Sequence, residues 1–209
     1  MRVLGLKGHI LLLMTAAVAA SLSAQAPKRV RRIAFDGAPI ATQLKDDDQV
    51  VVVSRVTDSI NFGNDVDSFI ATTSSFANIV ATIVVRQATG VLVNNDAWVS
   101  TRIVGVVDRV IKQTPPWHLT RGDTVEFWRG EGITNVGAIE VRTNEAFDFA
   151  TGSTYLILLR ASDGELGEFL PPLLISGGRL RNVTPARTRT FLLDGLRLDD
   201  FARKAARFK

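Results

Sequence analysis

The sequence predicts a mainly β fold, a five-stranded closed barrel with a short helix before it and an amphipathic helix at its C-terminal end. Two long segments rich in β-branched residues, 79–93 and 97–112, are separated only by three turn-forming residues. Shorter strand-like runs follow at 124–128, 154–160 and 169–175. The chain has no cysteine, so its stability has to come from the burial of apolar side chains.

The first 26 residues have the three parts of a secretory signal peptide. Positive charges at Arg2 and Lys7 precede an apolar run, Ile10–Ala20, and the small residues of Ala24–Ala26 follow. The apolar run is too short to cross a bilayer, which takes about 20 residues, and no later run is longer. We therefore expect cleavage after Ala26 and an exported protein without a membrane span, either periplasmic or extracellular.

Residues 27–48 show no sustained period, and the like charges of Asp46–Asp48 end them, so they predict a mobile lead-in. The β-branched run at 50–56 predicts a strand. From Asp65, which is placed to cap a first turn, apolar residues recur at intervals of three and four and predict a short helix. These residues are Val66, Phe69, Ile70, Thr73, Phe76 and Ala77.

The two segments at 79–93 and 97–112 predict a long antiparallel ribbon. Asn94, Asn95 and Asp96 between them tolerate the positive φ of a tight turn. Strands of about 15 residues exceed the usual five or six, which indicates that they coil around a small barrel. Gly90 and Gly105 are the expected bending points.

The last predicted elements are a strand that contains two prolines and an amphipathic helix. Pro171 and Pro172 cannot donate to a ladder, so the run at 169–175 should lie at an edge or break in two, and 179–183 is a further possible strand. In the last segment one apolar stripe has acids at its start and bases toward its end, which favours an amphipathic helix packed on the barrel. The stripe consists of Leu198, Phe201, Ala202, Ala205 and Phe208.

A bent hairpin, a third strand, a connection of roughly 25 residues and two more strands form the layout of an oligonucleotide/oligosaccharide-binding (OB) barrel. The segments IVATIVVRQ, WVSTRIVGVVDRVIK, LTRGDTVEFWRGEG, FDFATGSTYLILLR and GGRLRN, in this order before the C-terminal helix, resemble a family of exported bacterial proteins of uncharacterised activity. Ala81 stands where that family usually has glycine, and Glu131 separates the glycine pair. The resemblance implies an OB-like fold and an exported location, and no particular chemistry.

The chain has an acidic middle and basic ends. The middle of the chain, 34–178, holds 10 Lys or Arg against 18 Asp or Glu, whereas 179–209 holds nine against three. The basic ends are interpreted as solvated tails, and the alternative is that they bind an anionic partner electrostatically. The predicted parts of the chain are a signal peptide (1–26), the mobile lead-in (27–48), an OB-like barrel domain (49–184) and a basic tail with a helix (185–209).

The motifs with possible chemistry have simpler structural explanations. His118 is the only histidine after the signal peptide, so a hydrolase would have to use it, and no nucleophile in a recognisable context accompanies it. Arg121-Gly122-Asp123 is expected to be a turn entering a strand. The glycine-spaced segment 129–137 lacks the lysine of a phosphate loop, and 58–67 lacks the spacing of a calcium loop. We expect no catalytic residue, metal or cofactor.

Aromatic and basic side chains near the ribbon predict a ligand face. Trp98, Arg102, Trp128 and Arg129 could form a stacking platform of the kind OB barrels use, with an exposed Trp98 ring as its main element. The predicted function is an exported, non-catalytic module that binds a protein or a glycan. The alternatives are a hydrolase using His118 and binding of single-stranded nucleic acid or an anionic surface by the basic termini, with nucleic acid the less favoured partner.

Overall fold

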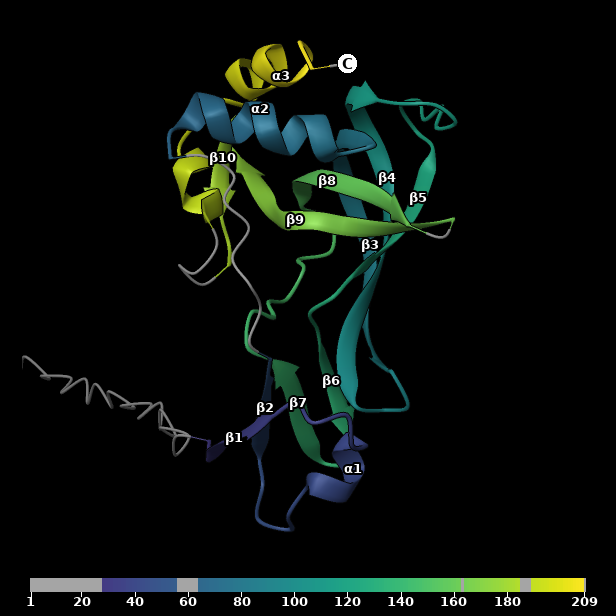
Figure 1. The fold of residues 1–209 in the computed structure, drawn as a ribbon, viewed down its shortest axis with the longest axis vertical. Coiled ribbons are helices and arrows are strands. Elements are labelled where there is room, and N and C mark those ends of the chain that lie inside the picture. The colour runs from purple at the N-terminus through teal and green to yellow at the C-terminus, as the bar shows by residue number, and fades with distance from the viewer. Residues whose placement is uncertain (1–27, 56–63, 163, 185–188, 209) are drawn as a thin grey trace, which may run out of the picture.

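A computed structural model describes residues 28–55, 64–162, 164–184 and 189–208, so the predicted signal peptide lies outside the described residues. The chain is mainly β. One sheet and its helices form the upper part in Figure 1, a smaller sheet forms the lower part, and one long ribbon runs through both.

The ribbon is formed by β3 (Ile79–Val93) and β4 (Trp98–Gln113), as the sequence predicts. The two strands pair in antiparallel register along their whole length, with three register shifts in the first half of β3. Asn94, Asn95 and Asp96 form the turn with φ of 55°, 56° and 62°. The predicted turn chemistry is therefore confirmed.

The upper sheet returns on itself. Strand β4 pairs with β5 (Thr124–Arg129), and β3 pairs with β8 (Thr154–Ser162), which in turn pairs with β9 (Glu165–Ser176). A parallel contact between β5 and β9, at Trp128 and Gly167, completes the ring of pairings. The inward side chains of these strands form one apolar cluster that includes Ile83, Ile103 and Phe127.

Two helices and a 3-10 turn cover the outer face of β8 and β9. Helix α2 (Val66–Phe76) begins where predicted, with the Asp65 carboxylate accepting from the backbone N–H of Asp67 and Ser68 at 2.9 Å. Helix α3 (Leu198–Ala205) buries Phe201, Ala202 and Ala205 of its predicted stripe, while Phe208 lies beyond the helix. The 3-10 turn η1 (Arg189–Leu193) adds to the same cluster beside α2. No helix of the described residues is long and apolar enough to cross a membrane.

Lys112 fixes the end of α2 to the ribbon. Its buried ammonium donates to the backbone carbonyls of Ser74 (2.5 Å) and Ala77 (3.1 Å), groups that the helix itself leaves without partners. Burial lowers the pKa of Lys112. Since the ammonium replaces water at these carbonyls, Lys112 has a structural role at the end of the strand.

The lower sheet has the order β1-β2-β7-β6 and is the main feature that the sequence did not predict. Strands β1 (Val30–Ala34), β2 (Val50–Ser54) and β7 (Ile139–Thr143) run parallel, and β6 (Ile133–Val136) pairs antiparallel with β7. Residues predicted as a lead-in without regular structure thus contain β1 and helix α1 (Ile40–Gln43). Together with the ribbon tip they bury a separate small core.

Strand β9 differs from its prediction at Pro171 and Pro172. The strand continues through both prolines and lies inside the sheet, with β8 along one side and with β5 and then β10 (Arg179–Asn182) along the other. Its register against β8 shifts between the pairs at Leu170 and Leu173, so neither proline occupies a ladder position. The missing N–H groups therefore remove no ladder hydrogen bond.

Gly90 marks the point where the ribbon passes against β6. A Cβ built on Gly90 would lie 1.7 Å from the Ile133 carbonyl oxygen, and Thr134 Oγ1 donates to the Gly90 carbonyl at 3.2 Å. Two backbones approach here without room for a side chain. Gly90, expected from the sequence as a bending point, is thus a point of close contact between the two sheets.

Replacing Gly90 by alanine should lower the free energy of unfolding by about 1–3 kcal/mol, because the atom that has to move belongs to the backbone and not to a flexible side chain. Gly130→Ala is the matched control, since a Cβ at Gly130 meets nothing within 4 Å and its φ is not positive. Chemical denaturation of both variants measures the difference. Equal free energies of unfolding would contradict the close contact.

Replacing Lys112 by methionine should lower the free energy of unfolding by about 1–3 kcal/mol, because two buried carbonyls lose their donor while the aliphatic volume is kept. The exposed Lys45 provides the control variant Lys45→Met. Thermal and urea unfolding compare the two. A Lys112→Met variant as stable as the parent would show that the α2 carbonyls do not depend on this ammonium.

Candidate functional site

The structure separates the four predicted ligand residues into two faces. Arg102 pairs with Trp128 across β4 and β5, and Thr101 pairs with Arg129 one position further on. Because successive side chains of a strand point to opposite faces, Arg102 and Trp128 share the outer face while Arg129 points inward. The predicted platform is therefore not one surface.

Trp98 is buried, contrary to the expectation of an exposed ring. Only 5% of it is exposed, and its indole nitrogen donates to the Gly130 carbonyl at 2.5 Å. The Phe35 ring meets it edge-on at 5.3 Å, and the guanidinium of Arg55 lies 5.6 Å from its centroid. Trp98 thus belongs to the core between the ribbon tip and the lower sheet, where residues predicted as a lead-in cover it.

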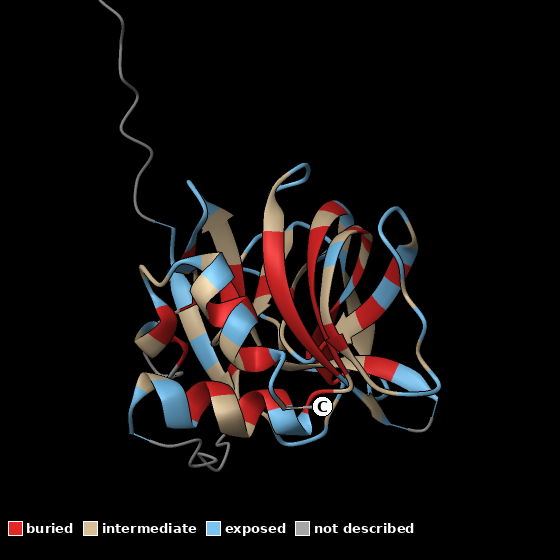
Figure 2. Ribbon diagram, turned by 90° about the horizontal axis from the view of Figure 1, so that it is seen from above, coloured by how far each residue is buried: buried red, intermediate tan, exposed pale blue. Residues whose placement is uncertain are grey.

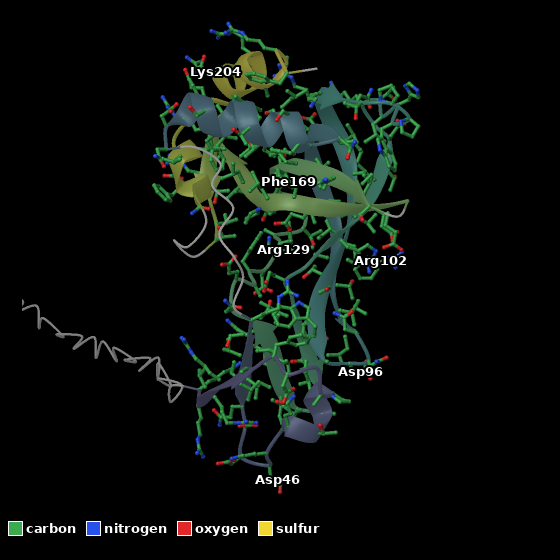
Figure 3. All side chains as sticks on the ribbon, viewed as in Figure 1. Asp46, Asp96, Arg102, Arg129, Phe169 and Lys204 are labelled. Atoms are coloured by element: carbon green, nitrogen blue, oxygen red, sulfur yellow. The ribbon has the colours of Figure 1, made fainter. Side chains whose placement is uncertain are left out.

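Paired residues form a row across the outer face of β3, β4, β5, β9 and β8. Thr89 pairs with Arg102, Arg102 with Trp128, Trp128 with Gly167, and Gly167 with Arg160. We call these five residues the outer row. Figure 3 shows Arg102 on the outer side of the ribbon, away from the helices.

Arg102 is held in place beside Trp128. Its Nε and one terminal nitrogen donate to the two oxygens of Glu126 at 2.6 and 2.7 Å, a bidentate pair between half-exposed side chains. This pairing lowers the pKa of Glu126 and raises the pKa of Arg102. A planar cation therefore stands fixed on the outer face, which reduces the entropy lost when a ligand binds.

Trp128 is half-buried and its indole makes no hydrogen bond or ring contact with the described part of the chain. Its neighbour in the row is Gly167, which has no side chain to cover the ring, and beyond it Arg160 is exposed. The geometry leaves an aromatic surface between two arginines. The sequence pattern indicates Arg102 and Trp128 but not Arg160, which is brought beside them only by the pairings of β9 with β5 and β8.

Arg129 lies at the end of the ring that faces the lower sheet, in the middle of the molecule in Figure 3. It is 2% exposed and donates to Glu168 at 2.5 Å and to the Glu145 carbonyl at 2.9 Å. Its guanidinium also lies 4.7 Å from the Phe147 centroid. Together with Glu131, these residues form what we call the buried charge cluster.

The buried charge cluster contains more polar atoms than it satisfies. Among the described residues, Arg129 Nε, Glu131 Oε2 and Glu168 Oε2 are buried without a hydrogen-bond partner. Burial raises the pKa of Glu168 to about 7, against the attraction of Arg129, and neighbouring carboxylates add to the rise. Burial also raises the pKa of Glu131. Glu168 thus holds a proton more tightly than an exposed glutamate does.

Alternation along β5 gives a sequence signal for the burial of Arg129. Val125 and Phe127 precede it at intervals of two and point into the ring. Glu168 carries no such signal, because it reaches Arg129 only through the pairing that closes the ring. The cluster is an internal charge pair, and no group of three or more metal-ligating residues is found in the described chain.

The other motifs have structural roles or no partner. Gly122 has a φ of +95°, and the Asp123 carboxylate accepts from the Thr120 N–H at 2.7 Å, which confirms the predicted turn at 121–123. His118 makes no hydrogen bond or ion pair with the described residues. The acidic segment 58–67 lies partly outside the described residues, and Asp65 within it caps α2.

Several basic residues of the two ends pair with acids. Lys28 contacts Glu140 and Arg31 contacts Asp48, whose pKa this pairing lowers to about 2. At the other end Lys204 pairs with Asp67 across α3 and α2. These pairs reduce the positive charge that either end presents to an anionic partner.

Comparison of the chain with protein-family models and with curated proteins gives no match. The candidate sites therefore rest on the geometry of the chain alone. Two of them remain after the fold is considered, the outer row on the surface and the buried charge cluster inside.

The stability of the protein should fall as the pH rises from about 4.5 to about 7. In this window folded Glu168 keeps its proton while the unfolded chain has lost it, so each rise in pH favours unfolding. Glu168→Gln, which mimics the protonated form, should lose much of this dependence.

Urea unfolding at a series of pH values measures the effect. The control is Glu165→Gln, an exposed glutamate on the same strand, which should keep the slope of the parent. A Glu168→Gln protein with an unchanged slope would show that Glu168 does not hold the proton.

Proposed function

We propose that this chain is an exported, non-catalytic binding module built on an OB-like barrel. The pairing order of the ring supports the fold: three consecutive strands β3, β4 and β5 form a meander, and β9 joins β5 in parallel and β8 in antiparallel. This is the strand arrangement expected of a five-stranded Greek-key barrel. The β6–β7 hairpin occupies the connection between its third and fourth strands.

The outer row is the observation that carries the proposed function. It combines a half-buried tryptophan face with a fixed arginine, a second exposed arginine and the hydroxyl of Thr89. Flat apolar faces stack on sugar rings, while guanidinium and hydroxyl groups bond to their oxygens. We therefore favour a glycan as ligand, with a protein as the second choice. The row lies on the strands that OB barrels use for ligands.

The alternative functions have less support from the geometry. A hydrolase would need a base beside a nucleophile, and His118 contacts no such group among the described residues. Nucleic-acid binding by the termini would need several unpaired positive charges together, whereas Lys28, Arg31 and Lys204 have acidic partners. Of the basic residues in 28–32, Arg32 alone makes no ion pair with the described part of the chain. Export, with a periplasmic or extracellular location, is part of the proposal and depends on the predicted signal peptide.

A screen of soluble oligosaccharides against the purified chain, followed by calorimetry of the best binder, tests the proposal. Trp128→Ala should weaken binding by about tenfold or more, as expected for an aromatic residue at the centre of a site. Phe191→Ala is the matched control, because Phe191 is 52% exposed and lies in η1, away from the outer row. Binding that survives Trp128→Ala unchanged would rule out the outer row as the glycan site.

A further inference from the structure

Strand β1 forms an open edge of the lower sheet. It is the terminal strand of the order β1-β2-β7-β6 and pairs, within the described chain, with β2 alone. In Figure 1 it lies at the rim of the lower part, away from the ring and its helices. Val30, Arg32 and Ala34 are all exposed, so described residues do not cover this side of β1.

The hydrogen bonds of β1 show which of its backbone groups bond to β2 and which have no partner among the described residues. The Arg29 carbonyl accepts from the Val50 N–H, and the Phe35 N–H donates to the Ser54 carbonyl. In a parallel ladder alternate residues of one strand bond to the neighbour. The odd-numbered residues therefore face β2, and the N–H and C=O groups of Val30, Arg32 and Ala34 point outward.

The charge at this edge selects between partners. Arg32 is exposed and makes no ion pair with the described residues, while Lys28 and Arg29 before it pair with Glu140 and Asp47. A carboxylate on an incoming strand would therefore find one unpaired cation, Arg32, at the centre of the edge.

A second copy of the chain does not fit this edge. Antiparallel pairing of two β1 strands centred on Arg32 places Arg32 opposite its own copy, and like charges directly opposite each other destabilise a sheet. Charged residues on edge strands prevent such self-association in general. The same residue attracts a strand that carries carboxylates, so the edge favours an acidic strand over a second copy of β1.

We propose that β1 is a docking edge for an extended acidic segment of a partner protein, which adds to the lower sheet as a further strand. The free backbone groups of Val30, Arg32 and Ala34 would provide the ladder, and Arg32 would select carboxylates. This surface is separate from the outer row, and the inference does not depend on the glycan proposal.

Fluorescence anisotropy with a labelled nine-residue peptide of alternating glutamate and valine tests the inference on the full chain. Saturable binding is expected, with no binding of the matched lysine–valine peptide. Ala34→Pro removes one outward N–H without touching the bonds to β2 and should weaken binding about three- to tenfold. Arg32→Glu should abolish binding of the glutamate peptide. Trp128→Ala should leave it unchanged, so failure of this inference and of the glycan proposal can be told apart.

Ala34→Ser, which keeps the N–H, is the control for Ala34→Pro, and circular dichroism checks that each variant is folded. If the proline variant fails to fold, Arg32→Glu alone decides the outcome. Absence of binding, equal binding of both peptides, or binding unaffected by Arg32→Glu would overturn the proposal. A dimer in sedimentation that Arg32→Glu strengthens or breaks would assign the edge to a second copy instead.

Discussion

The continuous pairing of β3 with β4 is the constraint on which both parts of the molecule depend. One half of this ribbon supplies two strands of the ring and closes its apolar interior. The other half extends beyond the ring and places Trp98 and Val99 in the core of the lower sheet. Most residues of 79–85 and 98–101 are buried, and Figure 2 shows that buried residues lie along many of the strands. Since the same two strands belong to both cores, neither part can form without ordering the ribbon.

The junction of the two parts depends on a charge that is costly to bury. Arg129 gives up its hydration inside the ring, and a single buried cation would cost several kcal/mol without a partner. Glu168, the Glu145 carbonyl and the Phe147 ring replace that hydration. Residues on both sides of the β6–β7 hairpin take part in these contacts. The cluster therefore ties the hairpin to the ring and leaves the outer face of β5 free to carry Trp128.

Local patterns were sufficient to predict the elements whose partners lie nearby in sequence. The β-branched runs with Asn94–Asp96 predicted the ribbon, the Asp65 cap predicted α2, and the apolar stripe predicted α3. The lower sheet could not be predicted in this way, because β2 pairs with β1 about 20 residues before it and with β7 about 90 residues after it. Short parallel strands leave no periodic signal that identifies such partners.

The same distinction applies to the candidate site. The sequence indicated Arg102 and Trp128, since alternation in β4 and β5 places both on the outer face. The prediction of an exposed Trp98 was wrong because Phe35, which covers the ring, lies in a segment whose apolar residues show no regular spacing. Arg160 and Glu168 reach their neighbours only through ring closure, which depends on one parallel contact between Trp128 and Gly167. A site whose residues meet only when the ring closes can be identified only once the fold is known.

Hydrogen exchange of the ribbon amides tests the central claim most directly. Amides of β3 and β4 on both sides of Gly90 should exchange as one slow unit, with protection close to that of global unfolding, because the two cores share these strands. Slow exchange confined to residues 79–85 and 103–113, with fast exchange of 88–93 and 98–101, would contradict the account. It would show a ring with a loosely attached hairpin in place of a ribbon that unites the two sheets.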